Sequence, residues 1–228
     1  MAIYLTTEAG DQLVTEDGDP LIEERHYEPY EGYNLFEVKP NWADEPTERL
    51  SRNMTILENV TGLPLVRSHT AGPIGSMDVM FTLEGRDEIK EFRSWLRAMK
   101  GRQVPVWVPT WNMDLKPTAD LSGSSITIES IGYEDNLYPH NARKHLAIIA
   151  YDGTIYPKGV TGASDNGTTE TLTLGSSLGT TLTKEHTIIS FLVLARLMRD
   201  EVKVVYITKD LAEVQIGFVE VPREAPAP

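Results

Sequence analysis

The chain has 228 residues, of which 40% are apolar, and a formal net charge of −13. This length suits one large domain, or a core domain carrying a smaller one, and no apolar run approaches the roughly eighteen residues of a membrane helix. Cysteine is absent, which excludes disulfides, thiolate nucleophiles and cysteine-ligated zinc. The N-terminus has neither the basic nor the apolar region of a signal peptide.

The negative charge is concentrated near the N-terminus. Residues 1–58 contain fourteen acidic residues against four basic ones. Such a segment repels phosphate backbones, so sequence-specific nucleic-acid binding is not expected. It forms either a solvated acidic face or a wall past which nucleic acid slides without sticking.

The first part of the chain predicts short strands. Residues 1–34 alternate apolar pairs with turn residues, which predicts a small β-ribbon or an arm that orders on contact with a partner. Prolines punctuate residues 35–75, so short strands near 55–57 and 63–66 are favoured over long helices. Residues 77–83 alternate apolar and polar side chains, as a half-buried strand does.

One amphipathic helix is predicted over residues 86–100. Acidic residues lie at its start and basic residues at its end, which complements the helix dipole, and Gly101 is placed to terminate it. After it, prolines at positions 105 and 109 indicate an edge strand, or a strand whose pairing is interrupted. The apolar residues of the helix fall on one stripe at helical period: Ile89, Phe92, Trp95, Leu96 and Met99.

The second half predicts a β module followed by strong strands. Residues 118–186 are rich in Thr, Ser and Gly, with short alternating pieces, one of them at 153–156, that are typical of a small barrel or sandwich. The β-branched run at 187–198 indicates a buried strand, and a hairpin turning at Lys209-Asp210 follows it. Residues 223–228 are expected to be a disordered tail. The predicted fold is therefore mainly β, of α+β type, with one packed amphipathic helix.

No arrangement of residues in the sequence indicates catalysis. The five histidines are scattered, and neither a nucleophile elbow nor a glycine-rich phosphate loop occurs. The chain is accordingly predicted not to be an enzyme, with no cofactor and no metal site. The aromatic residues serve either core packing or anchoring in a subunit interface, and an uncapped edge strand could continue a sheet into a neighbouring copy.

The segment FTLEGRDEIKEFRSWLRAMKGRQVPVWVPTWNMDL, residues 81–115, resembles the distal tail proteins and related tail-tip (baseplate) ring proteins of long-tailed bacteriophages and gene transfer agents. In these proteins a strand leads into an amphipathic helix, a basic Gly-Arg turn and an aromatic strand entering a Pro-Thr-Trp segment. An upstream Pro-Asn-Trp and the closing run 191–221 are similar as well. The residues carrying the resemblance are Pro40, Asn41, Trp42, Phe92, Trp95, Gly101, Arg102, Trp107, Pro109, Thr110 and Trp111.

The resemblance implies a structural virion protein that is made in the host cytoplasm and forms a hexameric ring in the tail tip. Residues 35–117 together with 187–222 would form a tail-tube-like β-sandwich core. The ring would join the tail tube protein to the tail-tip hub protein and let DNA pass through its lumen. The inserted module, residues 118–186, would face outward and hold peripheral proteins or tail fibres. The alternative is a peripheral tail module that binds carbohydrate or a receptor; neither reading involves a membrane.

Overall fold

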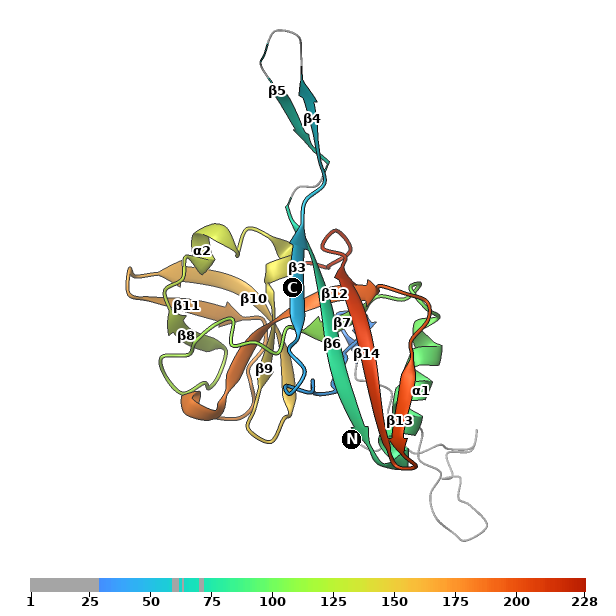
Figure 1. Cartoon of the computed structure of the whole chain (residues 1–228). Coiled ribbons are helices and arrows are strands. Elements are labelled where there is room, and N and C mark those ends of the chain that lie inside the picture. The colour runs from blue at the N-terminus through green and yellow to red at the C-terminus, as the bar shows by residue number, and fades with distance from the viewer. Residues whose placement is uncertain (1–28, 59–61, 63, 70–71) are drawn as a thin grey trace, which may run out of the picture.

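The computed structural model describes residues 29–58, 62, 64–69 and 72–228, and this part of the chain is mainly β with one long helix (Figure 1). A ten-stranded antiparallel sheet has the order β3-β6-β14-β12-β9-β10-β11-β8, with β13 beside β14 and β7 beside β12. The predicted mainly β fold with one packed helix is confirmed. In chain order the elements are β1 Pro29–Tyr30, β2 Tyr33–Asn34, β3 Thr47–Ser51, β4 Met54–Glu58, β5 Pro64–Ser68, β6 Ile74–Glu84, α1 Gly85–Met99, β7 Val106–Pro109, β8 Ser125–Glu129, α2 Tyr133–Asn136, η1 Asn141–Arg143, β9 His145–Ile149, β10 Ile155–Asp165, β11 Thr169–Leu174, η2 Lys184–His186, β12 Ile188–Leu197, β13 Val204–Thr208 and β14 Leu211–Glu220.

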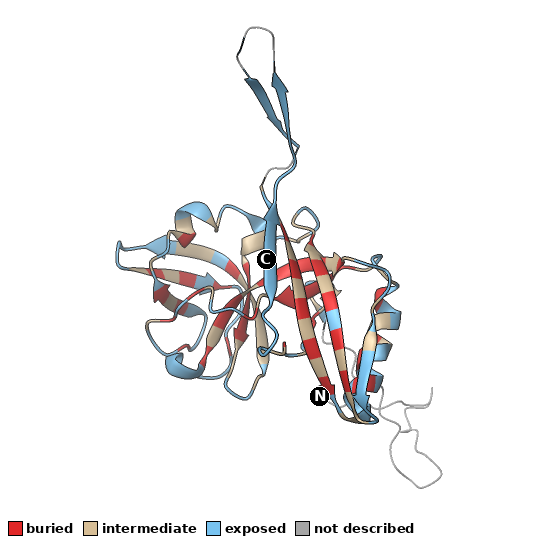
Figure 2. Ribbon diagram, in the orientation of Figure 1, coloured by how far each residue is buried: buried red, intermediate tan, exposed pale blue. Residues whose placement is uncertain are grey.

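The helix α1 packs its apolar stripe on the sheet, as the sequence predicts. Buried and partly exposed residues alternate along the whole of β6, and its buried side meets the helix (Figure 2). The Phe36 ring lies at the centre of this first core, 4.7 Å from the Trp95 ring and 5.1 Å from the Phe81 ring between centroids. The helix ends with Lys100 in the left-handed region, one residue before the predicted Gly101, which is also left-handed.

The strand β12 joins two regions of the core. Its second half pairs with β14 and β7 beside the first core, and its first half pairs with β9. Residues of β8, β9 and β11 form a second apolar cluster with Ile189 of β12. The sheet therefore runs without a break from the first core into the residues predicted to form the inserted module.

Several elements were not predicted. The strand β10 continues to Asp165, well past the expected piece at 153–156, and α2 and η1 were not expected at all. The β13–β14 hairpin turns at Lys209-Asp210 as predicted. Of the predicted N-terminal arm, residues 1–28 lie outside the described residues. The remainder forms the short β1–β2 pair.

The prediction of a disordered tail at residues 223–228 is wrong, because this segment lies against the body. The Pro226 carbonyl oxygen is 3.0 Å from His145 Nε2, and a Glu224 carboxylate oxygen is 2.6 Å from Arg196. Ala225 packs on the apolar cluster around Trp107. The tail is held because it supplies the acceptor that the buried imidazole needs.

His145 is fully buried and links both ends of the described chain. Its Nε2 faces the Pro226 carbonyl, which can only accept, so Nε2 carries the proton. Its Nδ1 then accepts from the Tyr30 hydroxyl at 3.0 Å. Burial lowers the pKa of His145, so the ring is neutral in the folded protein.

Acidification from pH 7.5 to 5 is expected to lower the free energy of unfolding. The His145 pKa is depressed in the folded state, so its stabilising effect is present above the unfolded pKa of 6.5 and is lost as the pH falls below it. The slope contributed by one proton is at most about 1.4 kcal/mol per pH unit. Urea titrations at several pH values across this range should show that the free energy of unfolding changes less steeply with pH in His145→Gln than in the wild type. In the matched control His140→Gln, an exposed site, the slope should stay that of the wild type. Equal slopes for all three proteins would contradict the neutral buried ring.

Candidate assembly surfaces

Most aromatic residues that carry the resemblance lie in the core. Phe92 and Trp95 of α1 are buried in the first core, and Trp111 packs beside them. Trp107 points to the opposite face of β7, where its Nε1 donates to the Tyr30 carbonyl at 2.8 Å. The interpretation of Trp107 and Trp111 as core residues is therefore confirmed over the interface alternative.

The Gly-Arg pair after α1 forms a clamp. Gly101 has φ +65°, and a Cβ there would lie 2.6 Å from an Asp200 carboxylate oxygen. That carboxylate accepts from the Arg102 backbone N–H at 3.0 Å and from its guanidinium at 3.1 Å, and these bonds hold the pKa of Asp200 below its usual value. The clamp fixes the chain leaving α1 to the loop that precedes β13.

The Pro-Thr-Trp segment folds back on β12. Pro109 ends the β7 ladder, and the Thr110 backbone N–H then donates to the Phe191 carbonyl at 3.0 Å. The Thr110 hydroxyl and the Phe191 N–H both donate to the Asp114 carboxylate. Burial raises the pKa of Asp114, although these two hydrogen bonds oppose the rise. The segment therefore organises the core and presents no surface feature.

The Pro-Asn-Trp motif brings one aromatic side chain to the surface. Pro40 is buried beside Phe81, and the Asn41 backbone N–H donates to the Met80 carbonyl at 2.8 Å. The Asn41 side-chain oxygen accepts from the Ala43 N–H at 3.0 Å and sets a turn. Trp42 is left 56% exposed at this turn. It is the signature aromatic available for contact with another protein.

The strands β4 and β5 form a hairpin, here called the arm, that stands clear of the body (Figures 1 and 2). Its strands pair only with each other among the described strands, and every residue of both is exposed. Ile56 lies opposite Val66 on one face, and Leu57 lies opposite Leu65 on the other. These four side chains are 51–59% exposed, so both faces of the arm are apolar.

The main sheet has two open edges beside the first core, whereas β7 and β8, which also end the sheet, are bridged by Leu35 and Pro117. Among the described strands, β3 pairs only with β6 and β13 pairs only with β14. They lie at opposite sides of the four strands β3, β6, β14 and β13. Apolar side chains are exposed on both edges, Leu50 on β3 and Ile207 on β13. Unpaired backbone groups on such edges can accept a strand from another chain.

Two surface features, the apolar arm and the basic side of α1, have signals in the sequence that did not enter the prediction. The neighbouring apolar pairs 56–57 and 65–66 put apolar side chains on both faces of a strand, which is unusual for a strand covered on one side only. Basic residues recur at helical spacing along α1, although only its apolar stripe was interpreted. In both cases the pattern was visible, but exposure depends on tertiary structure.

Other kinds of site find no support in the part of the chain that the structure describes. No three metal-ligating side chains come together there, and none of its helices is long and apolar enough to cross a membrane. A hollow of about 580 Å³ is lined by side chains of both charges, among them Arg49, Asp78 and Glu213. Neither a protein-family model nor a curated protein matches this chain.

Proposed function

We propose that this chain is a structural protein of a bacteriophage tail tip that assembles into a ring of six copies. The ring joins the tail tube protein to the tail-tip hub protein and lets DNA pass through its lumen. The order of the signature segments supports this family resemblance. The observation that carries the assembly is the exposed apolar arm.

The arm needs a partner for physical reasons. A two-stranded hairpin is marginally stable by itself in water, and this one exposes apolar side chains on both faces. Fully burying one aliphatic side chain is worth about 1.5–3 kcal/mol, so covering several half-exposed ones gains several kcal/mol per arm. The described part of the body does not cover the arm, so a neighbouring copy is the proposed partner.

The two open edges favour a ring over a twofold dimer. When different surfaces of the same chain meet head to tail, the assembly closes into a ring if the rotation between neighbours permits. The edges β3 and β13 are two such different surfaces on one sheet. Their pairing between neighbours would continue the sheet around the ring.

The sheet face turned away from α1 is the proposed lining of the lumen. On β6 and β14 this face carries Asp78 and Glu213, and neither strand contains lysine or arginine. Arg49 of β3 pairs with Asp78 at 3.5 Å, so Glu213 is the carboxylate on this face proposed to repel a phosphate backbone. Replacing Glu213 with lysine in an assembled phage is expected to slow DNA ejection while leaving the ring intact. Unchanged ejection kinetics would contradict this lining.

Placing a charge on each face of the arm is expected to prevent assembly. The variant Ile56→Asp/Leu65→Asp makes burial of the arm costly without touching the core. Light scattering and negative-stain images should show sixfold rings with an open channel for the wild type and monomers for the variant. Ile131→Asp, a comparably exposed apolar site on the module, is the matched control and should form rings. Rings that persist in the arm variant, or a wild type that is monomeric at high concentration, would contradict the proposal.

The alternative, a carbohydrate-binding tail module, would use exposed aromatic residues between 118 and 186. Tyr133 is fully buried there, whereas Tyr151 is 86% exposed beside His186, with ring centroids 5.4 Å apart. One exposed aromatic ring gives a sugar little surface on which to stack. The ring is therefore the function proposed here.

A further inference from the structure

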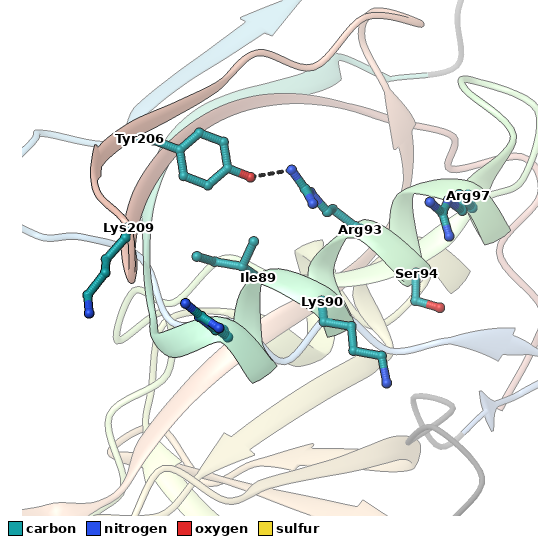
Figure 3. A pocket seen from close by; sticks show the side chains of 8 residues that line it. Ile89, Lys90, Arg93, Ser94, Arg97, Tyr206 and Lys209 are labelled. Carbon is teal, nitrogen blue, oxygen red and sulfur yellow. Dashed lines mark hydrogen bonds between the residues drawn. The ribbon is translucent and has the colours of Figure 1, made fainter.

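The solvent side of α1 carries a stripe of basic side chains. Arg86, Lys90, Arg93 and Arg97 are spaced four, three and four residues apart, which places them on one line along the helix. With Tyr206 and Lys209 from the β13–β14 hairpin they line a groove of about 410 Å³ (Figure 3). This basic groove lies on a chain whose net charge is −13.

The groove is partly organised in advance. The Arg93 guanidinium donates to the Tyr206 hydroxyl at 2.5 Å and lies 5.6 Å from the centre of its ring (Figure 3). Asp210 pairs with Arg86 at 3.2 Å and with Lys209 at 3.7 Å. Among the described residues that line the groove, five are basic and none is acidic, so the groove is suited to an acidic ligand.

The same chain contains a segment of the opposite charge. Residues 1–28 hold eight acidic residues and one arginine. Glu16, Asp17 and Asp19 place three carboxylates within four residues. The stripe from Arg86 to Arg97 is about 16 Å long at the rise of an α-helix, which roughly five extended residues would cover. We propose that the acidic residues 1–28 bind along this basic groove of their own chain.

The segment is long enough to reach the groove. Its anchor, Pro29, lies beside Tyr30 on the sheet face opposite α1. Crossing the sheet and the helix takes on the order of 30 Å, given a helix diameter of about 10–12 Å. Thr15 is fourteen residues from Pro29, a span of up to about 45 Å when extended.

Tethering favours the chain's own segment over other anions. A flexibly linked ligand acts at an effective concentration in the millimolar range. DNA is a weaker candidate, because the strong negative charge of the whole chain repels it. This inference is independent of ring formation.

The absence of cysteine permits a direct test by disulfide trapping in the full chain. Thr15→Cys is combined with Ser94→Cys, which lies in the groove, and mild oxidation is carried out at low micromolar concentration. An intrachain disulfide is expected in most molecules, seen by intact mass and a non-reducing gel. Its yield should fall severalfold in 0.5 M salt, since salt screens exposed charges, and in the added variant Arg97→Glu.

The matched control pairs Thr15→Cys with Tyr151→Cys, a more exposed site away from the groove, and is expected to stay largely reduced. Equal yields for the two pairs, or a yield insensitive to salt, would show random collision and overturn the proposal. Interchain dimers in place of the intrachain product would assign the groove to the segment of another copy and overturn it as well. Unchanged thermal unfolding of each variant shows that the trapped species is the folded protein.

Discussion

Replacing Glu220 with alanine is expected to lower the free energy of unfolding by about 3–5 kcal/mol, among the largest effects of any single substitution in this chain. Its carboxylate accepts two hydrogen bonds from the Arg143 guanidinium, at 2.9 and 3.3 Å, and one from the Gly75 backbone N–H at 3.2 Å. The side chains of Glu220 and Arg143 are only 8% and 22% exposed. Alanine would leave a mostly buried guanidinium without its counter-charge.

The pair also joins distant parts of the fold. Arg143 belongs to η1, between the strands of the second cluster, whereas Glu220 ends β14 and Gly75 lies on β6. Gly75 has no space for a side chain, because a Cβ there would lie 2.6 Å from the Glu220 Cδ. Gly75→Ala should therefore destabilise the protein by displacing the carboxylate from Arg143.

Urea or guanidinium titration measures this effect, and the chain offers a matched control. Glu129 pairs with Lys116 on the surface, where both side chains are at least half exposed, so Glu129→Ala should cost less than about 1 kcal/mol. The double variant Arg143→Met/Glu220→Leu should recover most of the loss, because it removes both charges together. If Glu220→Ala lowers the free energy of unfolding no more than Glu129→Ala does, the proposed stabilisation by a buried ion pair is contradicted.

Elements with a clear period were predictable from the sequence. The apolar stripe of α1 and the alternation of β6 reflect burial on one side, so the pattern alone defines them. The second half of β10 was missed because its residues KGVTGASD lack alternation. From Val160 to Asp165 it pairs with β11, whereas β9 pairs with Ile155 to Gly159. Such pairing depends on neighbours that are distant in sequence.

The surfaces were less predictable than the core for the same reason. The apolar residues of β4 and β5 look like ordinary strand residues, and only the tertiary structure shows that the arm leaves the body. The tail beyond Val221 lacks any periodic pattern, yet a buried imidazole captures its backbone carbonyl. Local pattern reports how a segment folds, whereas exposure depends on what the rest of the chain covers.

Replacing Trp107 with alanine is expected to cost about 3–5 kcal/mol of stability. The indole is fully buried on the opposite face of β7 from α1, with its ring centroid 4.5 Å from that of His145 and 5.6 Å from that of Tyr30. Its Nε1 donates to the Tyr30 carbonyl. Alanine would leave a large cavity and an unsatisfied acceptor beneath the first described strand.

Two further substitutions separate the hydrogen bond of Trp107 from its buried area, and compare this core residue with a signature residue at the surface. Trp107→Phe keeps most of the buried area but loses the donor, so it should cost about 1–3 kcal/mol. Trp42→Ala, at an exposed site, should change stability by no more than about 0.5 kcal/mol. If the signature combines core and contact residues as proposed, Trp42→Ala should weaken ring assembly while Trp107→Phe leaves it intact. Unfolding titrations and light scattering on the same samples measure both quantities, and a Trp42→Ala protein that forms normal rings would remove Trp42 from the proposed contact surface.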